Sequence, residues 1–521
     1  MLYGNLSRRK FLRGASAAGL ATVAAPRLGW SASGGTLTVS TYGDLQVLDP
    51  AFHLSAPETA MSELIYQHLI VFKGGQDTDW ELEAAESIEQ IDDTHIKFTL
   101  KPGIMWNDDL GEVTAEDVKF SFERIIDPEM QSPYAGDWGT LDHVEVIDKY
   151  SGVIVLKEYM ATLWTIALPN NAGMIVSKKA VEALPGKKFT TNPPCYCGPY
   201  RIKQWVPKQR VVFERNPNWT GAPQHWDEIV IIPIEDPAAE ELAYEAGDLD
   251  FSRLTLATLA RYREEGPPPN SKIIDIPSIA YVWMGMNIEN PALQDIRVRK
   301  AIQLAVDADT AVEAAYFGIA ERATGIIAPS LIGHREKNLV SRDVEAAKAL
   351  LREAGAEGLT LTLDTQTNTE YVTMAQVVQA SLAEAGINVV IQPRDSGTFW
   401  TLGDESAGDQ WKDIQLIIGR FTMSPDPSYA TEWFTCNQVG VWNWERFCNE
   451  EFDRLHDAAK REKDEAKRAA MYRRMQDLME ESGAYVFLTH ERDAFIHRAT
   501  IDAVLRPDGD PLYLKFKPTS A

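Results

Sequence analysis

The sequence is poor in the residue types that metal sites and cofactor-dependent catalysis use. Only 4 cysteines and 9 histidines occur among 521 residues, and no two histidines stand at i, i+4 on a convincing helix. The phosphate-binding loop, the dinucleotide-binding glycine turn, the zinc-protease helix and the hydrolase nucleophile elbow are all missing. These absences weaken the case for an enzyme, and we expect no cofactor and no metal.

Long apolar runs and an excess of basic charge are missing as well. Beyond the N-terminus, no segment has the roughly 18 uninterrupted apolar residues that a membrane span needs, so we expect a soluble mature protein. Lys and Arg number 51 against 76 Asp and Glu, which gives a net charge of -25. Such an acidic surface repels nucleic acid and anionic lipid. We interpret the charge as an aid to solubility.

The N-terminus has the pattern of an export signal. Ser7-Arg8-Arg9-Lys10-Phe11-Leu12 precedes a short apolar stretch of small residues, Gly14 to Ala25. Paired arginines followed by Phe-Leu are typical of twin-arginine signals, which carry folded proteins across the inner membrane. We predict cleavage between Ala25 and Ser33, with residues 1–33 as the signal. Its five basic and no acidic residues take the mature chain from -25 to about -30.

The cysteines divide into two pairs. Cys436 and Cys448 flank an 11-residue loop, and an even cysteine count in an oxidising compartment predicts that they form a disulfide. Closing such a loop stabilises the fold by about 3 kcal/mol in the chain-entropy model. For Cys195 and Cys197 two interpretations stay open, namely two buried free thiols or a strained local bridge.

Hydrophobic periodicity predicts a mixed α/β chain. Residues 36–40 alternate as a strand, while residues 281–287 and 414–418 are continuous apolar runs typical of buried strands. Thr114 begins a helix that ends before Pro128, Ser341 to Ala354 is a helix stopped by Gly355, and residues 452–481 are strongly amphipathic. The strand–helix–strand order over residues 360–393 favours a parallel or mixed sheet.

The early part of the chain is β-rich, the middle is α/β, and the tail returns to strand-like sequence. This order predicts two lobes joined by two crossovers, able to close like a hinge around a ligand. We place lobe I at residues 34–284 plus 491–521, with an inserted subdomain at about 60–190, and lobe II at residues 285–490.

Several ordered motifs cover nearly the whole mature chain: Trp106-Asn107-Asp108 with residues 114–124; Gly198-Pro199-Tyr200 with residues 214–219; Asn287 with residues 295–302 and Val306-Asp307; Leu382 with Gly386-Ile387; and Cys436 and Cys448 before residues 449–453. Together they resemble family 5 of the extracellular solute-binding proteins, the peptide/nickel/opine class that serves ABC transporters. The sequence departs from the family where Cys195-Tyr196-Cys197 precedes Gly198.

The resemblance implies a two-lobed periplasmic binding protein fold of the α/β class, with mixed sheets and a first lobe enlarged by an extra subdomain. It implies a small-molecule ligand enclosed between the lobes and delivery to ABC transporter permease subunits in the inner membrane. We expect a periplasmic monomer. Peptides, nickel chelates, opines and sugars are all carried by members of this family, and the fold does not decide among them.

Aromatic platforms and a few placed polar groups typify a binding cleft. We predict ligand contacts from six residues: Tyr42, Trp283, Trp400, Arg420, Asp426 and Trp433. In peptide-binding relatives an acidic residue matching Asp426 meets the ligand amine, and the planar fork of Arg420 suits a ligand carboxylate. Together they favour a short peptide, an amino-acid conjugate or an opine-like ligand.

Each of these residues also has a purely structural interpretation. An aspartate between two prolines is often only a turn residue, a tryptophan is often part of the core, and the alternative role for Arg420 is an ion pair with a neighbouring acid. Two other functions remain open: a twin-arginine-exported enzyme with an unrecognised cofactor, and a ligand sensor with no part in transport.

Overall fold

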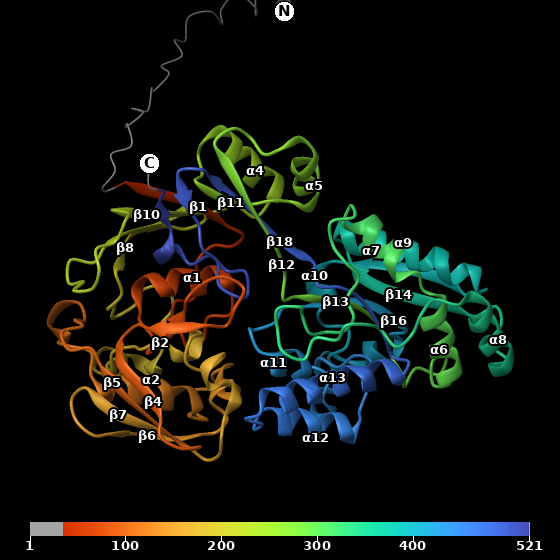
Figure 1. Ribbon diagram of the computed structural model, residues 1–521, viewed down its shortest axis with the longest axis horizontal. Coiled ribbons are helices and arrows are strands. Elements are labelled where there is room, and N and C mark those ends of the chain that lie inside the picture. The colour runs from red at the N-terminus through yellow and green to blue at the C-terminus, as the bar shows by residue number, and fades with distance from the viewer. Residues whose placement is uncertain (1–34, 520–521) are drawn as a thin grey trace, which may run out of the picture.

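A seven-stranded mixed sheet is the base of the first lobe in the computed structural model, which describes residues 35–519 (Figure 1). β1 is parallel to β10 and β11, and the remaining pairings are antiparallel. The predicted signal, residues 1–33, lies outside the described residues. In pairing order the strands are β12 (Ser271–Pro277), β18 (Arg492–Arg498), β11 (Phe251–Arg253), β1 (Thr36–Thr41), β10 (Glu228–Pro233), β9 (Arg210–Arg215) and β8 (Tyr200–Val206).

Between β1 and β8 the chain forms a subdomain with its own antiparallel sheet, drawn at the lower left of Figure 1. Its pairing order is β4 (Ala85–Gln90), β5 (His95–Leu100), β7 (Ser151–Leu156) and β6 (Leu141–Val146). Helix α2 (Ala115–Ile126) packs on β6. Its N-cap is Thr114, whose backbone N–H donates to the Asp117 carboxylate at 2.9 Å, so the predicted helix start is confirmed. The other first-lobe helices and strands are α1 (Ala56–Ile65), β2 (Ile70–Phe72), β3 (Trp80–Leu82), α3 (Lys178–Glu182), α4 (Pro237–Ala246), α5 (Leu256–Glu265), β19 (Ile501–Asp502) and β20 (Lys517–Pro518).

The second lobe, residues 281–489, is built on a five-stranded mixed sheet. In pairing order its strands are β15 (Asn388–Arg394), β14 (Thr360–Gln366), β16 (Leu416–Phe421), β13 (Tyr281–Met286) and β17 (Tyr485–Thr489). Its helices are α6 (Ile296–Ala305), α7 (Ala308–Ala315), α8 (Val344–Ala354), α9 (Thr369–Glu384), α10 (Ser396–Phe399), α11 (Pro427–Glu432), α12 (Glu450–Ala459) and α13 (Glu465–Glu481). Together, the two sheets confirm the predicted α/β class.

Both faces of this second sheet are covered, which explains why β13 is hydrophobic throughout. Successive side chains of a strand point to opposite faces. Accordingly, Val282 and Met284 pack into the core formed with α6, α7 and α9, whereas Tyr281 and Trp283 pack into the core formed with α12 and α13. All six residues of β13 are buried, as expected for a strand with no solvent-facing side.

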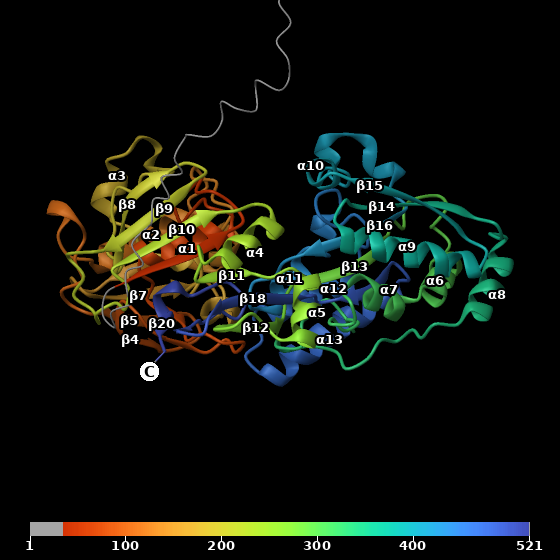
Figure 2. The same cartoon turned by 90° about the horizontal axis from the view of Figure 1, so that it is seen from above.

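Two short segments connect the lobes. The chain passes from β12 to β13 through residues 278–280 and returns from β17 to β18 through residues 490–491. The predicted boundary between residues 284 and 285 falls inside β13, which pairs wholly within the second sheet, so the passage occurs a few residues earlier. His490 Nδ1 lies 3.2 Å from the Ala280 carbonyl oxygen and so links the two segments. Figure 2 shows β12 and β18 running side by side toward the second lobe.

Two helix predictions need correction. The amphipathic stretch 452–481 is two helices, α12 and α13, because the chain breaks after Ala459 and Asp464 starts a new helix by accepting a hydrogen bond from Lys467 N–H. Helix α8 begins three residues later than predicted, at Val344, since Asp343 is its N-cap. Its predicted end at Gly355 is confirmed, and this glycine has a φ of 67°.

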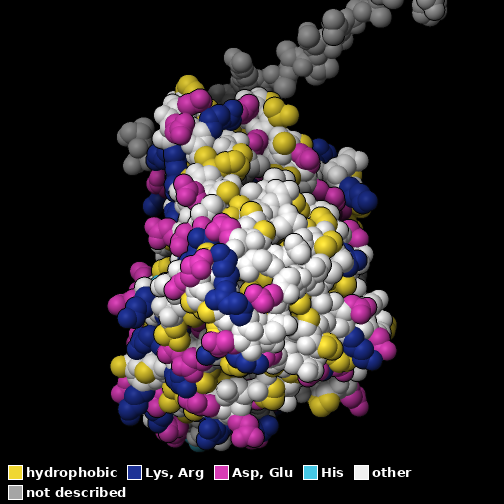
Figure 3. All heavy atoms as spheres, turned by 90° about the vertical axis from the view of Figure 1, so that its right-hand side faces the viewer, with side chains coloured by type: hydrophobic (Ala, Val, Ile, Leu, Met, Phe, Trp, Pro, Cys, Tyr) yellow, Lys and Arg dark blue, Asp and Glu magenta, His cyan; other side chains and the backbone are white. Residues whose placement is uncertain are grey.

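Figure 3, which looks at the outer end of the second lobe, shows acidic and basic side chains interspersed and hydrophobic ones scattered. Among residues 35–519, no helix has the length and apolar character required to cross a bilayer.

Candidate ligand-binding site

A pocket of about 410 Å³ in the second lobe brings together three of the six predicted ligand residues. Such a volume suits a small solute. The pocket lies where β16 ends, outside the carboxyl end of a central strand, a common position for ligands in α/β sheets. Its lining residues are Trp400, Arg420, Phe421, Thr422, Tyr429, Trp433 and Trp442.

Four aromatic rings form one continuous wall of the pocket. The ring of Trp400 stacks on Phe421 with centroids 5.8 Å apart and an interplanar angle of 18°. Trp442 stands edge-on to Phe421 at 6.1 Å and to Trp433 at 6.1 Å. Edge-to-face and offset arrangements at these distances are favourable, so the rings hold each other in place and present a largely rigid apolar surface.

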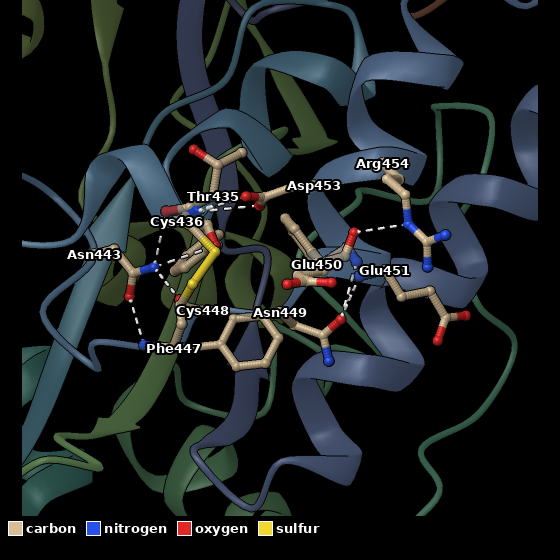
Figure 4. Close-up of a disulfide and its surroundings, with 12 residues drawn as sticks. Thr435, Cys436, Asn443, Phe447, Cys448, Asn449, Glu450, Glu451, Asp453 and Arg454 are labelled. Atoms are coloured by element: carbon tan, nitrogen blue, oxygen red, sulfur yellow. Dashed lines mark hydrogen bonds between the residues drawn. A yellow bond between two sulfur atoms is a disulfide. The ribbon is translucent and has the colours of Figure 1, made fainter.

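A disulfide fixes the loop that carries Trp442. Cys436 and Cys448 are joined, with their Cα atoms 4.5 Å apart (Figure 4). Inside the loop, the Asn443 side-chain amide donates to the Phe447 carbonyl at 2.6 Å. Asn449 then accepts hydrogen bonds from Glu451 and Phe452 and begins α12. The loop is therefore tied at both ends next to the pocket.

Arg420 is held at the rim of the pocket by a carboxylate. Its Nε donates to Glu491 at 2.7 Å and its Nη1 donates to the Thr422 hydroxyl at 2.8 Å. Burial disfavours the guanidinium charge, but the neighbouring Glu491 outweighs this effect and raises the pKa of Arg420 above its ordinary value. Glu491 also accepts hydrogen bonds from the hydroxyls of Tyr316 and Tyr371. The sequence predicted a ligand carboxylate as the partner of Arg420. In the structure its partner is Glu491, which belongs to the segment connecting the second lobe to the first.

Asp426 lies outside the pocket lining and is buried. Its carboxylate accepts hydrogen bonds from Arg468 Nη2 at 2.7 and 2.9 Å, and from the Ser428 backbone N–H at 2.9 Å as the N-cap of α11. Burial alone would raise its pKa, but Arg468 outweighs this and holds the pKa of Asp426 below its ordinary value. The structure therefore gives Asp426 a role in capping and ion pairing, and its predicted pairing with a ligand amine stays a prediction.

Trp283 is likewise part of the core. Its side chain is buried, and its indole N–H donates to the Glu445 carboxylate at 2.6 Å. Phe421 packs against it at a centroid distance of 4.8 Å and is itself a pocket-lining residue. Trp283 therefore supports the aromatic wall from behind and does not line the pocket.

Tyr42 belongs to the first lobe and approaches the site from the other side. It is 46% exposed, and the Arg253 guanidinium stands over its ring at 5.3 Å. Arg420 and Asp510 both lie within electrostatic range of its hydroxyl. The structure thus places Tyr42 in the space between the lobes, facing the rim of the pocket.

The lobes also touch beside the pocket. The Thr165 hydroxyl of the inserted subdomain donates to Asp426 at 2.9 Å, and the Ala161 backbone N–H donates to the Lys460 carbonyl at 2.9 Å. Arg461 pairs with Glu158 at 2.7 Å. Tyr429, which lines the pocket, also lies within electrostatic range of Tyr134 and Asp137 of the first lobe, so this side of the pocket is close to the other lobe.

Tyr429, Glu491 and Asp510 were not among the predicted site residues. Tyr429 lies on the short helix α11, whose N-cap is Asp426. The available signal was an aromatic residue two positions after the Pro-Asp-Pro segment. Glu491 and Asp510 had no such signal. They lie near the end of the sequence, and only the return of the chain from the second lobe to the first brings them close to Arg420 and Tyr42.

Cys195 and Cys197 are both buried free thiols in the structure, which answers the question that the sequence left open. Burial raises the pKa of the Cys195 thiol to about 12. Among residues 35–519, no group of three or more His, Cys, Asp or Glu side chains is arranged to hold a metal ion.

The chain is similar to several transport receptors. It is 26% identical over 362 residues to a putative ABC transporter peptide-binding protein of Brucella ovis, a match that spans 66% of each protein, slightly under two thirds of that relative's length. It is 24% identical to the dipeptide-binding protein of Escherichia coli, over 87% of this chain and 89% of that protein.

Solved structures with the same fold include the substrate-binding protein CtaP of Listeria monocytogenes. Its TM-score is 0.82 at 19% identity, over 94% of this chain and 100% of that one. DppA from Helicobacter pylori, in complex with a peptide, has a TM-score of 0.77 at 22% identity, with 94% and 99% covered. These likenesses confirm the predicted two-lobed periplasmic binding protein fold.

The sequence model of the bacterial extracellular solute-binding proteins, family 5, matches residues 79–440. That match covers well over half of the chain and includes the aromatic residues Trp400, Phe421 and Trp433 of the pocket. The resemblance that the ordered motifs indicated is thereby confirmed. The chain belongs to the bacterial extracellular solute-binding proteins, family 5.

Proposed function

We propose that this protein captures a small solute between its two lobes and delivers it to the permease of an ABC transporter. The observation that carries the proposal is the aromatic pocket at the end of β16, in a fold whose two lobes are connected by two short segments. Hinge closure over such a pocket is the usual way in which two-lobed proteins enclose a ligand.

Short peptides, amino-acid conjugates and opine-like molecules remain the proposed ligand class. Relatives named as peptide-binding and dipeptide-binding proteins support this choice, as does the structure of MoaA from Agrobacterium tumefaciens with mannopinic acid, similar to this chain at a TM-score of 0.76 and 24% identity. With Asp426 and Arg420 both engaged by protein groups, the pocket binds the solute first through its aromatic wall.

The site of action proposed is the periplasm, reached through the twin-arginine signal in residues 1–33. The acidic mature chain would act as a monomer that docks on the permease subunits. Replacing Arg8 and Arg9 by lysine should strand the precursor in the cytoplasm, and undiminished periplasmic protein from this variant would contradict twin-arginine export.

Thermal unfolding of protein stripped of bound solute tests the receptor function. The mature protein is unfolded, washed, refolded and heated with peptides, opines, sugars and metal chelates in separate samples. A ligand at 100 times its dissociation constant adds about 2.7 kcal/mol to the free energy of unfolding. A clear rise in melting temperature with one class identifies the cargo, whereas no rise with any class contradicts the proposal.

A further inference from the structure

The chemistry of the pocket wall restricts what can rest on it. Five of its seven lining residues are aromatic, and the polar side chains of Arg420 and Thr422 already hydrogen-bond each other. The remaining polar groups are the Tyr429 hydroxyl and the indole N–H donors of the three tryptophans. A hydroxyl-rich ring such as a sugar would lose water from most of its hydroxyls here without gaining partners, at a cost in free energy. A flat apolar ring loses nothing on transfer and gains stacking contacts.

The positive charges at the mouth of the pocket are already paired. Arg420 donates to Glu491 at 2.7 Å. Arg253, which stands over Tyr42, donates to Glu240 from Nε at 2.9 Å. A ligand carboxylate arriving here would meet guanidinium groups whose charge is already balanced. The mouth therefore offers little net attraction to an anion.

On the first-lobe side, in contrast, two described carboxyl groups form no ion pair. The Asp510 carboxylate is half-buried and has no hydrogen bond or ion pair within residues 35–519. Its neighbour Gly509 lies against Asp493, because a Cβ at Gly509 would stand 2.5 Å from the Asp493 Oδ2. Asp493 has Ser278 as its hydrogen-bond partner. Neither carboxyl group forms an ion pair within residues 35–519, although Arg506 lies within electrostatic range of Asp510 and Arg420 within range of Asp493.

The pKa values of Asp510 and Asp493 are both raised, which means that the ionised carboxylates are poorly stabilised in the structure. Burial and the nearby Asp508 raise the pKa of Asp510 well above its ordinary value. Burial also raises the pKa of Asp493 to about 7. An ammonium group placed beside them would relieve this cost by favouring the ionised carboxylates. Tyr42, which lies within electrostatic range of both Asp510 and Arg420, connects this acidic side to the rim of the aromatic pocket.

We infer that the solute carries a flat unsaturated ring next to a cationic amine, with the ring on the wall of Trp400, Phe421 and Trp442 and the amine toward Asp510 and Asp493. This inference rests on the proposed receptor function and narrows its ligand class. An N-terminal aromatic residue of a short peptide fits this description, and so does an arylalkylamine.

Four probes separate the two features of the ligand. Isothermal titration of the stripped mature protein is carried out with Phe-Ala (ring and amine), Ala-Ala (amine without ring), N-acetyl-Phe-Ala (ring without cation) and 2-phenylethylamine (ring and amine without peptide). Phe-Ala should bind at least tenfold more tightly than Ala-Ala and than N-acetyl-Phe-Ala, and 2-phenylethylamine should bind measurably. Equal affinities within either pair, or no binding of any probe, would overturn the inference.

Matched variants assign the two features to residues. Trp442→Ala should weaken Phe-Ala binding at least tenfold without changing Ala-Ala binding, and Trp442→Phe should restore much of it. Asp510→Asn should weaken Phe-Ala binding at least tenfold and leave N-acetyl-Phe-Ala unchanged. The controls are Trp219→Ala and Asp79→Asn, which should have no effect. Trp219 lines a different pocket, in the first lobe, and Asp79 pairs with Lys73 on the surface. Unchanged binding in Trp442→Ala or Asp510→Asn would refute the assignment.

The same experiments distinguish this inference from the receptor function. A rise in melting temperature with a sugar or chelate, without binding of any probe, would leave the receptor function standing and reject the ring-bearing amine. No rise with any solute would reject the receptor function, and the inference with it.

Discussion

The hydroxyl of Thr165 in the first lobe donates a hydrogen bond to the carboxylate of Asp426 in the second lobe at 2.9 Å. The same carboxylate pairs with Arg468 and caps α11. One side chain thus serves the interior of its own lobe and the contact between the lobes, and the two roles can be separated by mutation.

Asp426→Asn should destabilise the protein whether or not a ligand is present. The change leaves the buried Arg468 guanidinium without its counter-charge, and breaking a buried pair in this way costs about 3 to 5 kcal/mol. Thr165→Val removes only the hydrogen bond between the lobes and should cost about 1 kcal/mol or less. Denaturant unfolding of both variants measures the difference. Equal losses of stability would show that the contact between the lobes, and not the ion pair, dominates at Asp426.

Glu445→Gln should stabilise the protein in alkaline solution. Burial raises the pKa of Glu445 to about 7 from 4.5, with the hydrogen bond from Trp283 opposing this rise. Because the folded state holds the proton more tightly than the unfolded state, stability is full below pH 4.5 and is lost as pH rises toward 7. This rise in the pKa corresponds to about 3 kcal/mol of folding free energy.

Gln keeps an oxygen that can accept from Trp283 and removes this loss. At pH 8 the variant should be more stable than the wild type by up to that amount, and at pH 4 the two should be alike. Urea unfolding at both values measures the effect. A variant less stable than the wild type at pH 8 would mean that the ionised carboxylate is needed by the core.

Replacing Cys436 and Cys448 by serine should lower stability by about 3 kcal/mol, since the unfolded chain regains the entropy of the open loop. Because the loop carries Trp442, whose ring contacts Trp433 and Phe421, acrylamide should quench tryptophan fluorescence more strongly in the double variant. Unaltered quenching would indicate that ring packing alone holds the loop.

Cys195 and Cys197 should be inert in the native protein. Both are buried, and burial raises the pKa of each thiol, so little thiolate exists at neutral pH. A thiol reagent such as dithionitrobenzoate should therefore react with neither in buffer and with both after unfolding in guanidinium chloride. Reaction of the native protein on the same time scale as the unfolded one would contradict this burial.

Local patterns predicted much of the scaffold. The capping residue Thr114 and the apolar run of β13 each carry their signal within a few neighbouring residues, and the ordered motifs identified the family. The structure brings Trp400, Arg420 and Trp433 together in one pocket, and their contact with a ligand stays a prediction.

The roles of Asp426 and Trp283 could not be derived in this way. Each depends on a partner far along the chain: Arg468 is 42 residues from Asp426, and Glu445 is 162 residues from Trp283. A Pro-Asp-Pro segment looks the same whether its carboxylate meets a ligand or an arginine. Only the tertiary fold decides which partner is present.

Every residue that lines the aromatic pocket comes from the second lobe. In the proposed receptor, a solute would dock while the lobes are apart, and the first lobe, with Tyr42 and Asp510, would add its contacts only on closure. The second lobe would then set how fast a solute is taken up, and the first lobe would set how long it stays. A transporter that separates the lobes would remove the contacts of the first lobe and leave the aromatic pocket of the second lobe unchanged.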